Sequence, residues 1–379
     1  MAGSTQVAVT LEQCWHEVPG GVASSAIEST RALLAHTDLR LVGVAARHSS
    51  PPPAPWVPPI EVRHLPLPRL ALYETWHRFR RPTVQRATGP VDVIHVTGMA
   101  MPPRSAPMVV TVHDLAFLAD PSQFTPRGVR FFHRAIDLAR RDADIVVCPS
   151  KATADECIAN GFSARRVRVV PWGVDVVPAS ADEVARVRRA HRLDRPYVFW
   201  NGTIEPRKNL PVLLDAFARL GRTDVDLVIG GRAGWNDELA AIERRSGVGV
   251  RRLGFVPAAD LGPLHRGAAV FCFPSRQEGF GLPVLEAMAQ GAPVVTSSGT
   301  ATAEVVGDAG LTVAPDDIIG FTDALRGLLD DPDRARALGD AGRRRATQVF
   351  TWKRTADGLS DAYAEAIDLA RRSRQPRRR

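Results

Sequence analysis

The chain contains two consecutive series of short apolar runs rich in β-branched residues, and amphipathic segments separate many of the runs. The first series comprises residues 6–11, 39–45, 91–96, 108–113, 144–149 and 167–171, and the second comprises residues 197–202, 225–231, 250–255, 269–274 and 292–297. Continuous apolar runs indicate strands buried on both faces, and strands alternating with helices indicate parallel sheets covered by helices. The sequence therefore predicts an α/β protein with two doubly wound parallel-sheet domains.

The length of 379 residues agrees with two domains, since a domain takes roughly 150 residues. The boundary falls in the proline-rich segment 171–196, where Ser180 or Asp182 is placed to cap a short helix. We expect a first domain over residues 1–175 and a second over residues 176–352. A helix over residues 353–370 is expected to pack back toward the first domain, ahead of an arginine-rich tail, 371–379.

The net charge of +8 belongs mostly to that tail, which holds six arginines and no acid. The other 370 residues carry only +2, so overall charge gives little support to nucleic-acid binding, and no nucleic-acid partner is expected. The tail could instead contact an anionic membrane surface, or remain a solvated tail without a partner. Only three residues are lysines, against 46 arginines, so each lysine draws attention.

Localisation and metal binding are constrained by what the sequence lacks. No apolar run approaches the ~18–20 residues that span a bilayer, and the first residues lack the basic segment of a signal peptide. The four cysteines are scattered without a CxxC pair, which argues against a disulfide framework or a zinc site. The acidic triplets 142–144, 224–226 and 331–333 are assigned to helix ends and turns. We expect a cytoplasmic protein, with peripheral contact at the inner membrane face, and no metal site.

Residues 69–81 place Leu72, Tyr73, Trp76 and Phe79 near one face of a predicted helix that is also basic. Such a face can pack on its own domain or contact a membrane or an acceptor molecule. Packing within the first domain is the preferred interpretation.

Four motifs stand where strands lead into helices, the edge at which open α/β sheets bind ligands. Gly20 and Gly21 precede a helix predicted over residues 24–36, which suits a phosphate but also a plain glycine turn. There is no GxGxxG, which argues against a dinucleotide-dependent dehydrogenase. Arg207 and Lys208 stand together in a strand-to-helix loop and suit a diphosphate, with two solvated charges as the alternative.

The segment 273–295 carries the strongest local pattern. Glu278 is predicted in a glycine-rich loop, and Glu286 about one turn inside the following helix. The backbone N–H groups of residues 280–282 would face an anion, and the two carboxylates suit the hydroxyls of a sugar and a ribose. Helix capping is the alternative for the acids. In the first domain His113 ends a buried strand, where it could contact a substrate or serve a structural role.

Together these motifs resemble a known family. The glycine pair, VHD at 112–114, PS at 149–150, VPWGVD at 170–175, GTIEPRKNL at 202–210, GFVP at 254–257 and the E-x7-E at 278–286 occur in the order found in the large retaining glycosyltransferase family 4. The resemblance covers about residues 6–352 and extends to a bacterial mannosyltransferase-like branch. It implies the GT-B architecture, two facing Rossmann-like domains with a cleft between them.

The resemblance also implies roles. The C-terminal domain would bind a nucleotide-diphosphate sugar, with Arg207 and Lys208 on the diphosphate and Glu286 on the ribose. Glu278 and the backbone of Phe280, Gly281 and Leu282 would hold the sugar and phosphates. Gly202, Thr203 and Val256 would line the donor site, and the base would lie near residues 230–232 and 255–256. In the N-terminal, acceptor-binding domain, Gly20 and Gly21 would approach the β-phosphate and His113 the transferred sugar.

One departure from the family concerns Thr203, where many relatives carry arginine; Arg207 is expected to replace it. Glu205 has no assigned role. The expected reaction is retaining hexosyl transfer without a metal or other cofactor. GDP-mannose is preferred over a UDP-hexose as donor, and the acceptor is a glycan or glycolipid. The alternatives are a nucleotide-sugar epimerase of the same fold and a non-enzymatic protein that binds anionic lipid or RNA.

Overall fold

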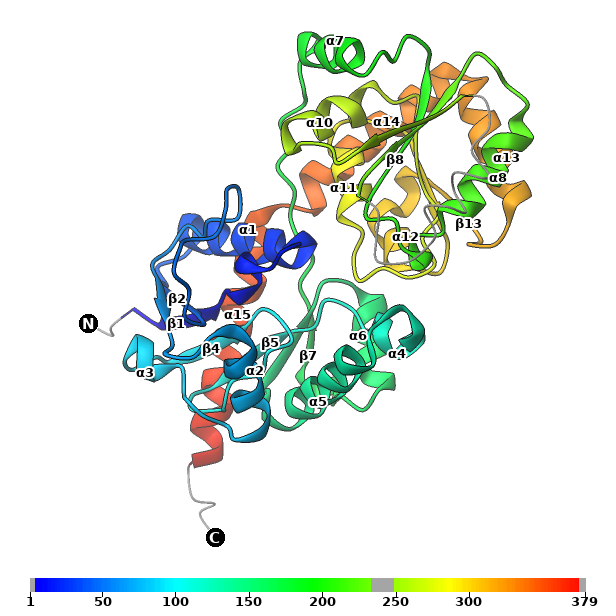
Figure 1. Ribbon diagram of the computed structural model, residues 1–379. Coiled ribbons are helices and arrows are strands. Elements are labelled where there is room, and N and C mark those ends of the chain that lie inside the picture. The colour runs from blue at the N-terminus through cyan, green and yellow to red at the C-terminus, as the bar shows by residue number, and fades with distance from the viewer. Residues whose placement is uncertain (1–3, 233–248, 375–379) are drawn as a thin grey trace. The chain divides into compact units, whose positions relative to one another are not determined.

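The computed structural model describes residues 4–232 and 249–374. The chain forms two compact units, each built on one parallel sheet (Figure 1). The first unit comprises the residues up to Gly173 together with those from Trp352 onward, and the second is Val174–Thr351. The predicted α/β class with two parallel sheets is confirmed.

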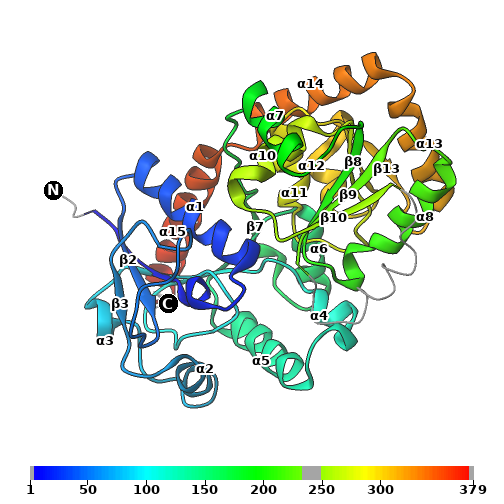
Figure 2. The ribbon, with the colours of Figure 1, turned by 45° about the horizontal axis from the view of Figure 1, so that its top comes forward.

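The sheet of the first unit has seven strands in the order β3-β2-β1-β4-β5-β6-β7, all parallel to their neighbours. Successive strands follow one another outward from β1 to β3 and, in the other direction, from β4 to β7, so the switch point lies between β1 and β4. Figure 2 shows β2 and β3 side by side. The strands are β1 (Gln6–Thr10), β2 (Arg40–Ala45), β3 (Val62–His64), β4 (Val93–Val96), β5 (Met108–Thr111), β6 (Ile145–Cys148) and β7 (Val167–Val169). The helices are η1 (Glu12–Trp15), α1 (Gly20–His36), α2 (Arg69–Arg78), α3 (Gln85–Thr88), α4 (Ala116–Ala119), η2 (Pro121–Gln123), α5 (Pro126–Asp142), α6 (Lys151–Ala159), η3 (Ala164–Arg166) and α15 (Trp352–Arg374).

Side chains that alternate along each strand of the first unit enter two separate cores. Val93 of β4 and Val109 of β5 pack in the core that contains α1 and α15. Their neighbours Ile94 and Val110 belong to the other core, which includes Trp76 of α2. The sheet is therefore buried on both faces, as its continuous apolar strands predict.

Helix α15 completes the first unit although it follows the whole of the second unit in sequence. Leu359 and Tyr363 are buried against α1 and the sheet, and Figure 1 shows α15 beside β4 and β5. The Tyr363 hydroxyl lies 2.8 Å from His95 Nδ1, and His95 Nε2 lies 2.8 Å from Thr111 Oγ1. Burial lowers the pKa of His95 to about 3, so this buried histidine is neutral and its contacts are structural.

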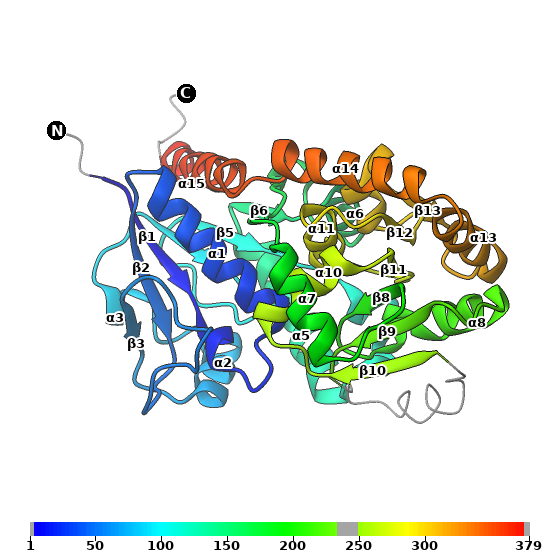
Figure 3. The same cartoon turned by 90° about the horizontal axis from the view of Figure 1, so that it is seen from above.

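The second unit repeats the plan with six parallel strands in the order β10-β9-β8-β11-β12-β13, and Figure 3 shows β8, β9 and β10 side by side. Its switch point lies between β8 and β11. The strands are β8 (Tyr197–Asn201), β9 (Asp226–Gly230), β10 (Val250–Gly254), β11 (Val270–Phe273), β12 (Val294–Ser297) and β13 (Leu311–Val313). The helices are α7 (Ala181–Ala190), η4 (Pro206–Lys208), α8 (Leu210–Leu220), α10 (Ala258–Gly267), α11 (Leu282–Ala289), α12 (Ala301–Val306), η5 (Gly307–Ala309), α13 (Ile318–Leu329) and α14 (Pro332–Val349).

Local details refine the sequence-based picture. Each predicted apolar run contains a strand, but β3 and β13 were not predicted. Ser180 caps α7 in a capping box with Glu183. Helix α1 begins at Gly20 instead of residue 24, so the glycine pair forms its first turn and not a loop before it. Gly20 has a φ of +61° with open space around it, which explains the glycine there.

The remaining predictions concern cysteines, membranes and the tail. All four cysteines are buried and free. Among the described helices, none combines the length and apolarity needed to cross a bilayer. Of the arginine-rich tail, Arg371 and Arg372 still belong to α15, whereas residues 375–379 lie outside the described residues.

Replacement of Leu359 by alanine should destabilise the first unit by about 2–5 kcal/mol, because it leaves a cavity in the core between α15 and the sheet. Hydrogen–deuterium exchange should quicken in β1, β5 and α1 and stay unchanged in β8 and β11. Leu369→Ala, on the same helix with 37% of the residue exposed, is the matched control. Equal effects of the two substitutions would contradict this role of α15.

Candidate functional site

The candidate site lies at the switch point of the second unit, where the neighbouring strands β8 and β11 end. The chain leaving β8 forms η4, which carries Arg207 and Lys208, and the chain leaving β11 carries Glu278 before entering α11. Strand order thus brings together two segments about 70 residues apart in sequence. This is the edge at which open parallel sheets bind ligands.

Lys208 and Glu278 form a buried ion pair. Lys208 Nζ lies 2.5 Å from Glu278 Oε1, and the two side chains are only 9% and 8% exposed. The ammonium also lies 5.1 Å from the centre of the Phe273 ring. A buried ion pair of this kind needs further hydrogen bonds to offset the loss of water around both charges.

Surrounding groups supply those hydrogen bonds. Ser275 Oγ donates to Glu278 Oε1 at 2.6 Å, and Arg207 Nη1 lies 3.3 Å from Glu278 Oε2. Arg207 Nε in turn contacts Glu205 Oε2 at 2.9 Å, which gives the unassigned Glu205 a partner. The Glu278 carboxylate is therefore held by a lysine, an arginine and a serine.

Asn209 fixes the loop that presents the two cations. Its backbone is left-handed, with a φ of 56°, a conformation that asparagine tolerates better than most residues. Its side-chain Nδ2 donates to the carbonyls of Pro274 at 3.0 Å and Pro315 at 2.7 Å, so η4 is tied to the segment that follows β11. Ser275 and Asn209 are absent from the predicted set. Asn209 directly follows Lys208 and Ser275 lies in the segment 273–295, but neither position indicates the contact that the residue makes in the folded unit.

Electrostatics favour the ionised pair. Burial alone would raise the pKa of Glu278, but Lys208 and Arg207 hold it below its usual value. Burial lowers the pKa of the Lys208 ammonium, and the charge of Glu278 opposes this. With Arg207 and Glu205 alongside, two cations face two carboxylates. The group therefore offers an anion the N–H donors of two cationic side chains and has no excess of positive charge.

Glu286 has the opposite environment. It lies inside α11, and its carboxylate makes no hydrogen bond or ion pair within the described part of the chain. Burial raises its pKa to about 7. A desolvated carboxylate without a partner is poised to accept hydrogen bonds from a ligand.

The start of α11 offers donors beside these carboxylates. Gly281 has a φ of 106°, and the N–H groups of Phe280, Gly281 and Leu282 donate to no acceptor in the described residues. Phe280 itself is buried against Phe350, with ring centres 5.8 Å apart. These free N–H groups at a helix start can bind an anion.

Three further loops meet at the ends of β8, β9 and β10. Gly202 N–H donates to Gly230 O at 2.9 Å, and Gly231 N–H donates to Gly254 O at 2.6 Å. A Cβ on Gly231 would lie 1.8 Å from Gly202 O, so only glycine fits. Thr203 follows on the first of these loops and is half-buried. The loops form one close-packed surface.

The same surface carries the site predicted for a base. Val256 is buried, whereas Phe255 is 61% exposed, and the Arg232 guanidinium lies 4.4 Å from the centre of the Phe255 ring. An exposed aromatic ring beside an arginine is a suitable platform for a planar ligand group.

In the first unit His113 follows β5 at the same kind of strand end. Its Nε2 lies 2.9 Å from Thr97 O, and its ring lies 5.9 Å from that of Trp172. Because a carbonyl accepts this bond, Nε2 carries the proton, and burial lowers the pKa of the ring. Neutral His113 therefore has a lone pair at Nδ1 for a hydroxyl donor. The predicted residues Gly20 and Gly21 stand at the start of α1, on a different strand connection.

Aspartates of the three acidic triplets have protein partners. Asp142 pairs with Arg80 at 2.5 Å, Asp224 pairs with Arg222 at 2.6 Å, and Asp331 caps α14. Over residues 4–232 and 249–374, no three His, Cys, Asp or Glu side chains are grouped to hold a metal ion.

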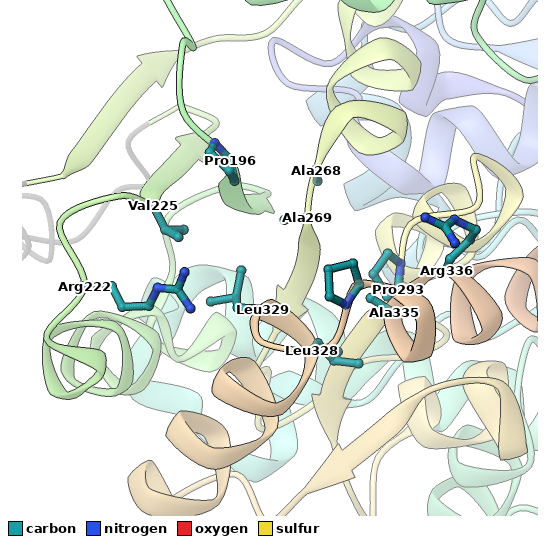
Figure 4. A pocket seen from close by; sticks show the side chains of 11 residues that line it. Pro196, Arg222, Val225, Ala268, Ala269, Pro293, Leu328, Leu329, Ala335 and Arg336 are labelled. Atoms are coloured by element: carbon teal, nitrogen blue, oxygen red, sulfur yellow. The ribbon is translucent and has the colours of Figure 1, made fainter.

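An apolar cavity of about 320 Å³ lies elsewhere in the second unit (Figure 4). Pro196, Val225, Ala269 and Pro293, which precede β8, β9, β11 and β12, line it together with residues of α13 and α14. It thus lies at the opposite ends of the strands from Lys208 and Glu278, and it contains none of the predicted site residues.

Two family models match the chain. The model described as Glycosyltransferase Family 4 matches residues 19–178, and the model described as Glycosyl transferases group 1 matches residues 195–331. A relative in Escherichia coli, O-antigen chain mannosyltransferase B, is 32% identical over 281 residues, 72% of this chain and 74% of the relative. The chain belongs to the family 4 glycosyltransferases. It is an enzyme that transfers a glycosyl group.

Other relatives and structures agree with this assignment. The D-inositol 3-phosphate glycosyltransferase of Salinispora tropica is 31% identical to this glycosyltransferase over 393 residues, 92% of this chain and 81% of the relative. Solved structures share the fold: Anabaena HepE in complex with UDP and glucose has a TM-score of 0.73 at 19% identity, covering 95% of this chain and 99% of that one. WaaG, a glycosyltransferase of lipopolysaccharide biosynthesis, has a TM-score of 0.69 at 17% identity, covering 96% and 99%. The fold is GT-B, as the resemblance implied.

Glu286→Gln should stabilise the unliganded glycosyltransferase at high pH. A pKa raised by folding favours the protonated state of the folded protein, so the wild type loses stability as the pH rises from 4.5 toward 7. Glutamine does not titrate. The advantage of the variant should therefore grow from near zero at pH 4.5 to at most about 3 kcal/mol above pH 7. Thermal unfolding at pH 5 and pH 8 measures it, and an advantage independent of pH would contradict the desolvation of the half-buried Glu286 carboxylate.

Proposed function

We propose that this glycosyltransferase transfers a hexosyl group, with mannose preferred, from a nucleotide-diphosphate sugar to a glycan or glycolipid acceptor. The observation that carries the proposal is the buried group of Arg207, Lys208 and Glu278 at the switch point of the second unit. It holds two cationic side chains in place before any ligand arrives.

The chemistry of the reaction makes use of these cations. Cleavage of the anomeric bond develops negative charge on the departing diphosphate, and preorganised cations stabilise that charge without reorganisation. Arg207 and Lys208 bind the diphosphate, and the free N–H groups of residues 280–282 add donors for its oxygens. The residues present can therefore supply the electrostatic stabilisation that a metal ion gives in other transferases.

Glu286 accepts hydrogen bonds from the ribose hydroxyls, which would stabilise its ionised form. Glu278, whose carboxylate is already held by Lys208 and Ser275, borders the sugar. The loops with Gly202, Thr203 and Val256 line the site, and the base lies near Arg232 and Phe255. In the first unit, His113 contacts the transferred sugar through Nδ1, and Gly21 approaches the β-phosphate.

We further propose that transfer proceeds with retention at the anomeric carbon. The acceptor oxygen attacks the face from which the diphosphate leaves, and a departing phosphate oxygen takes the acceptor proton. Glu278, the carboxylate assigned to the sugar, is engaged by Lys208, Arg207 and Ser275, which argues against its use as a nucleophile. This mechanism follows the family resemblance of the sequence motifs.

The donor and acceptor are suggested by relatives. The Escherichia coli relative is named a mannosyltransferase, which supports GDP-mannose, and the structurally similar HepE was solved with UDP-glucose, which keeps a UDP-hexose as the second candidate. The named relatives are transferases, which supports transfer over the epimerase alternative.

We retain the cytoplasmic face of the membrane as the proposed place of action. The membrane contact of the tail involves residues 375–379, which lie outside the described residues.

A donor screen tests the proposal. The full chain should be stabilised against thermal unfolding by one class of nucleotide among GDP, UDP and ADP, and should release that nucleotide from the matching sugar donor. GDP release from GDP-mannose is the expected result. The absence of binding to all three nucleotides would overturn the proposed function.

Lys208→Ala should lower kcat/KM for the donor by roughly 10²–10³, because it removes a preorganised cation from the departing diphosphate. Lys353→Ala is the matched control, since Lys353 is exposed and pairs with Asp357 on the surface. Loss of Lys208 also leaves the buried carboxylate of Glu278 without its lysine partner. A double variant, Lys208→Met with Glu278→Gln, therefore removes both charges. The double variant should regain thermal stability without regaining activity; recovery of transfer would contradict the role of the pair.

Activity should survive exhaustive treatment with EDTA, because the cations of the site are side chains. The initial rate after chelation and gel filtration should match the untreated rate, and added Mg²⁺ or Mn²⁺ should not raise it. A rate restored only by a divalent ion would show that the diphosphate is held through a metal.

A further inference from the structure

A second group of polar and aromatic side chains gathers in the first unit at the carboxyl ends of β1, β2 and β3, and none of them belongs to the predicted donor site. These side chains come from η1 and the residue after it, from the segment leaving β2, from the last residue of β3, and from the first two turns of α2. We call them the β1–β3 cluster: Glu12, Trp15, His16, His48, His64, Arg69 and Tyr73.

Three rings of the cluster form a rigid platform. Trp15 stacks on His48 with ring centres 4.7 Å apart and planes 9° apart, and His64 meets Trp15 edge-on at 5.6 Å. Trp15 Nε1 donates to Ser50 O at 2.9 Å, and His64 Nδ1 donates to Ala46 O at 2.6 Å. Because these contacts fix all three rings, the platform exists before any ligand binds.

Glu12 is the acid of the cluster, and its charge is already engaged. Glu12 Oε2 accepts the backbone N–H of Ala46 at 2.7 Å, and Oε1 lies 2.9 Å from His48 Nε2. Glu12 is 4% exposed. Its carboxylate therefore supports the platform and is not presented to solvent as an acceptor.

Arg69 is the cation of the cluster. It is half-buried, yet its guanidinium makes no hydrogen bond or ion pair within the described part of the chain. Its charge acts on His16 and Tyr73, and His16 Nε2 lies 3.2 Å from the Tyr73 hydroxyl. A half-buried guanidinium beside two neutral hydrogen-bonding groups is suited to an anion with several oxygens.

Hydrogen bonds connect this cluster to His113 along one edge of the sheet. Gln13, between Glu12 and the platform, donates from Nε2 to Thr97 Oγ1 at 2.7 Å, and Thr97 O accepts from His113 at 2.9 Å. The cluster follows β1, β2 and β3, whereas Thr97 and His113 follow β4 and β5, the next strands in the same sheet. With strands about 4.8 Å apart, this row extends for roughly 15–20 Å from His113.

We propose that the β1–β3 cluster binds the acceptor and that the acceptor carries a phosphate group. Arg69 holds the phosphate, with His16 and Tyr73 beside it, and the face of the Trp15 platform holds an adjoining sugar or polyol ring. The bound acceptor extends along the row of strand ends, so that its reacting hydroxyl lies toward His113. This inference rests on the proposed function, because it names the acceptor class for the same reaction.

Calorimetry with the full chain tests the proposal. Matched probes are glucose with glucose 6-phosphate, glycerol with glycerol 3-phosphate, and vesicles of phosphatidylcholine with vesicles of phosphatidylglycerol. The member of at least one pair whose phosphate gives it a net negative charge should bind at least tenfold more tightly than its match without net charge. Arg69→Gln should weaken that binding ten- to a hundredfold, and Arg69→Lys should retain part of it.

Arg78→Gln is the matched control, because Arg78 ends the same helix, is exposed and pairs with Glu74. It should leave binding unchanged, and all variants should keep the wild-type unfolding temperature within a few degrees. Loss of soluble phosphate binding in Arg69→Gln supports a free sugar or polyol phosphate as acceptor. Loss of phosphatidylglycerol binding alone supports a lipid-linked phosphate. Equal binding by wild type and Arg69→Gln, or no preference for any of the anionic phosphate probes over its match without net charge, would overturn the proposal.

Failure of this inference can be separated from failure of the proposed function. Titration of the same samples with GDP and UDP reports the donor site, which Arg69→Gln should not affect. A protein that binds a nucleotide but shows no Arg69-dependent phosphate binding would retain the proposed function and refute the acceptor class. Arg69-dependent phosphate binding without nucleotide binding would refute the proposed function and keep a phosphate site in the first unit.

Discussion

Both units depend on the same constraint, a parallel sheet buried on both faces. Side chains from such a sheet are enclosed in two cores, as Val109 and Val110 are, so polar groups that meet a ligand can stand only where the strands end. At the carboxyl ends, neighbouring strands deliver distant segments to one place. The Lys208–Glu278 pair results from the adjacency of β8 and β11, and the contact between Gln13 and Thr97 from that of β1 and β4.

Much of this arrangement was predictable because strands and helices follow from the spacing of apolar residues along the sequence. The apolar runs predicted each long strand, and the eight-residue separation of two acids placed Glu278 in a loop and Glu286 in the following helix. Strands β3 and β13 escaped prediction because each has three residues and none of them is fully buried, which leaves no apolar run to recognise. Strand β7 is as short, but it begins with buried Val167 and its apolar run continues to buried Val170. Partners such as Ser275 and Asn209 were not predictable from local pattern, since their roles depend on contacts between segments that only the folded sheet brings together.

The two carboxylates of the site show how environment divides one side-chain type between two tasks. Glu278 is satisfied within the protein by Lys208, Arg207 and Ser275, so it shapes the cation pair before a ligand arrives. Glu286 is desolvated and has no such partner among the described residues, so its ionised form is unfavourable until hydrogen-bond donors approach it. A site of this kind combines one rigid charge group with one group whose protonation responds to what binds.

The position of α15 has a consequence for how the chain is made. The first unit begins at the N-terminus, yet the core between its sheet and α1 is closed by Leu359, Tyr363 and their neighbours. During synthesis, that apolar face remains exposed until the residues of the second unit and then α15 have left the ribosome. The earlier half of the protein is thus the later one to be completed. Its assembly is tied to synthesis of nearly the whole chain, which disfavours the release of a finished first unit on its own.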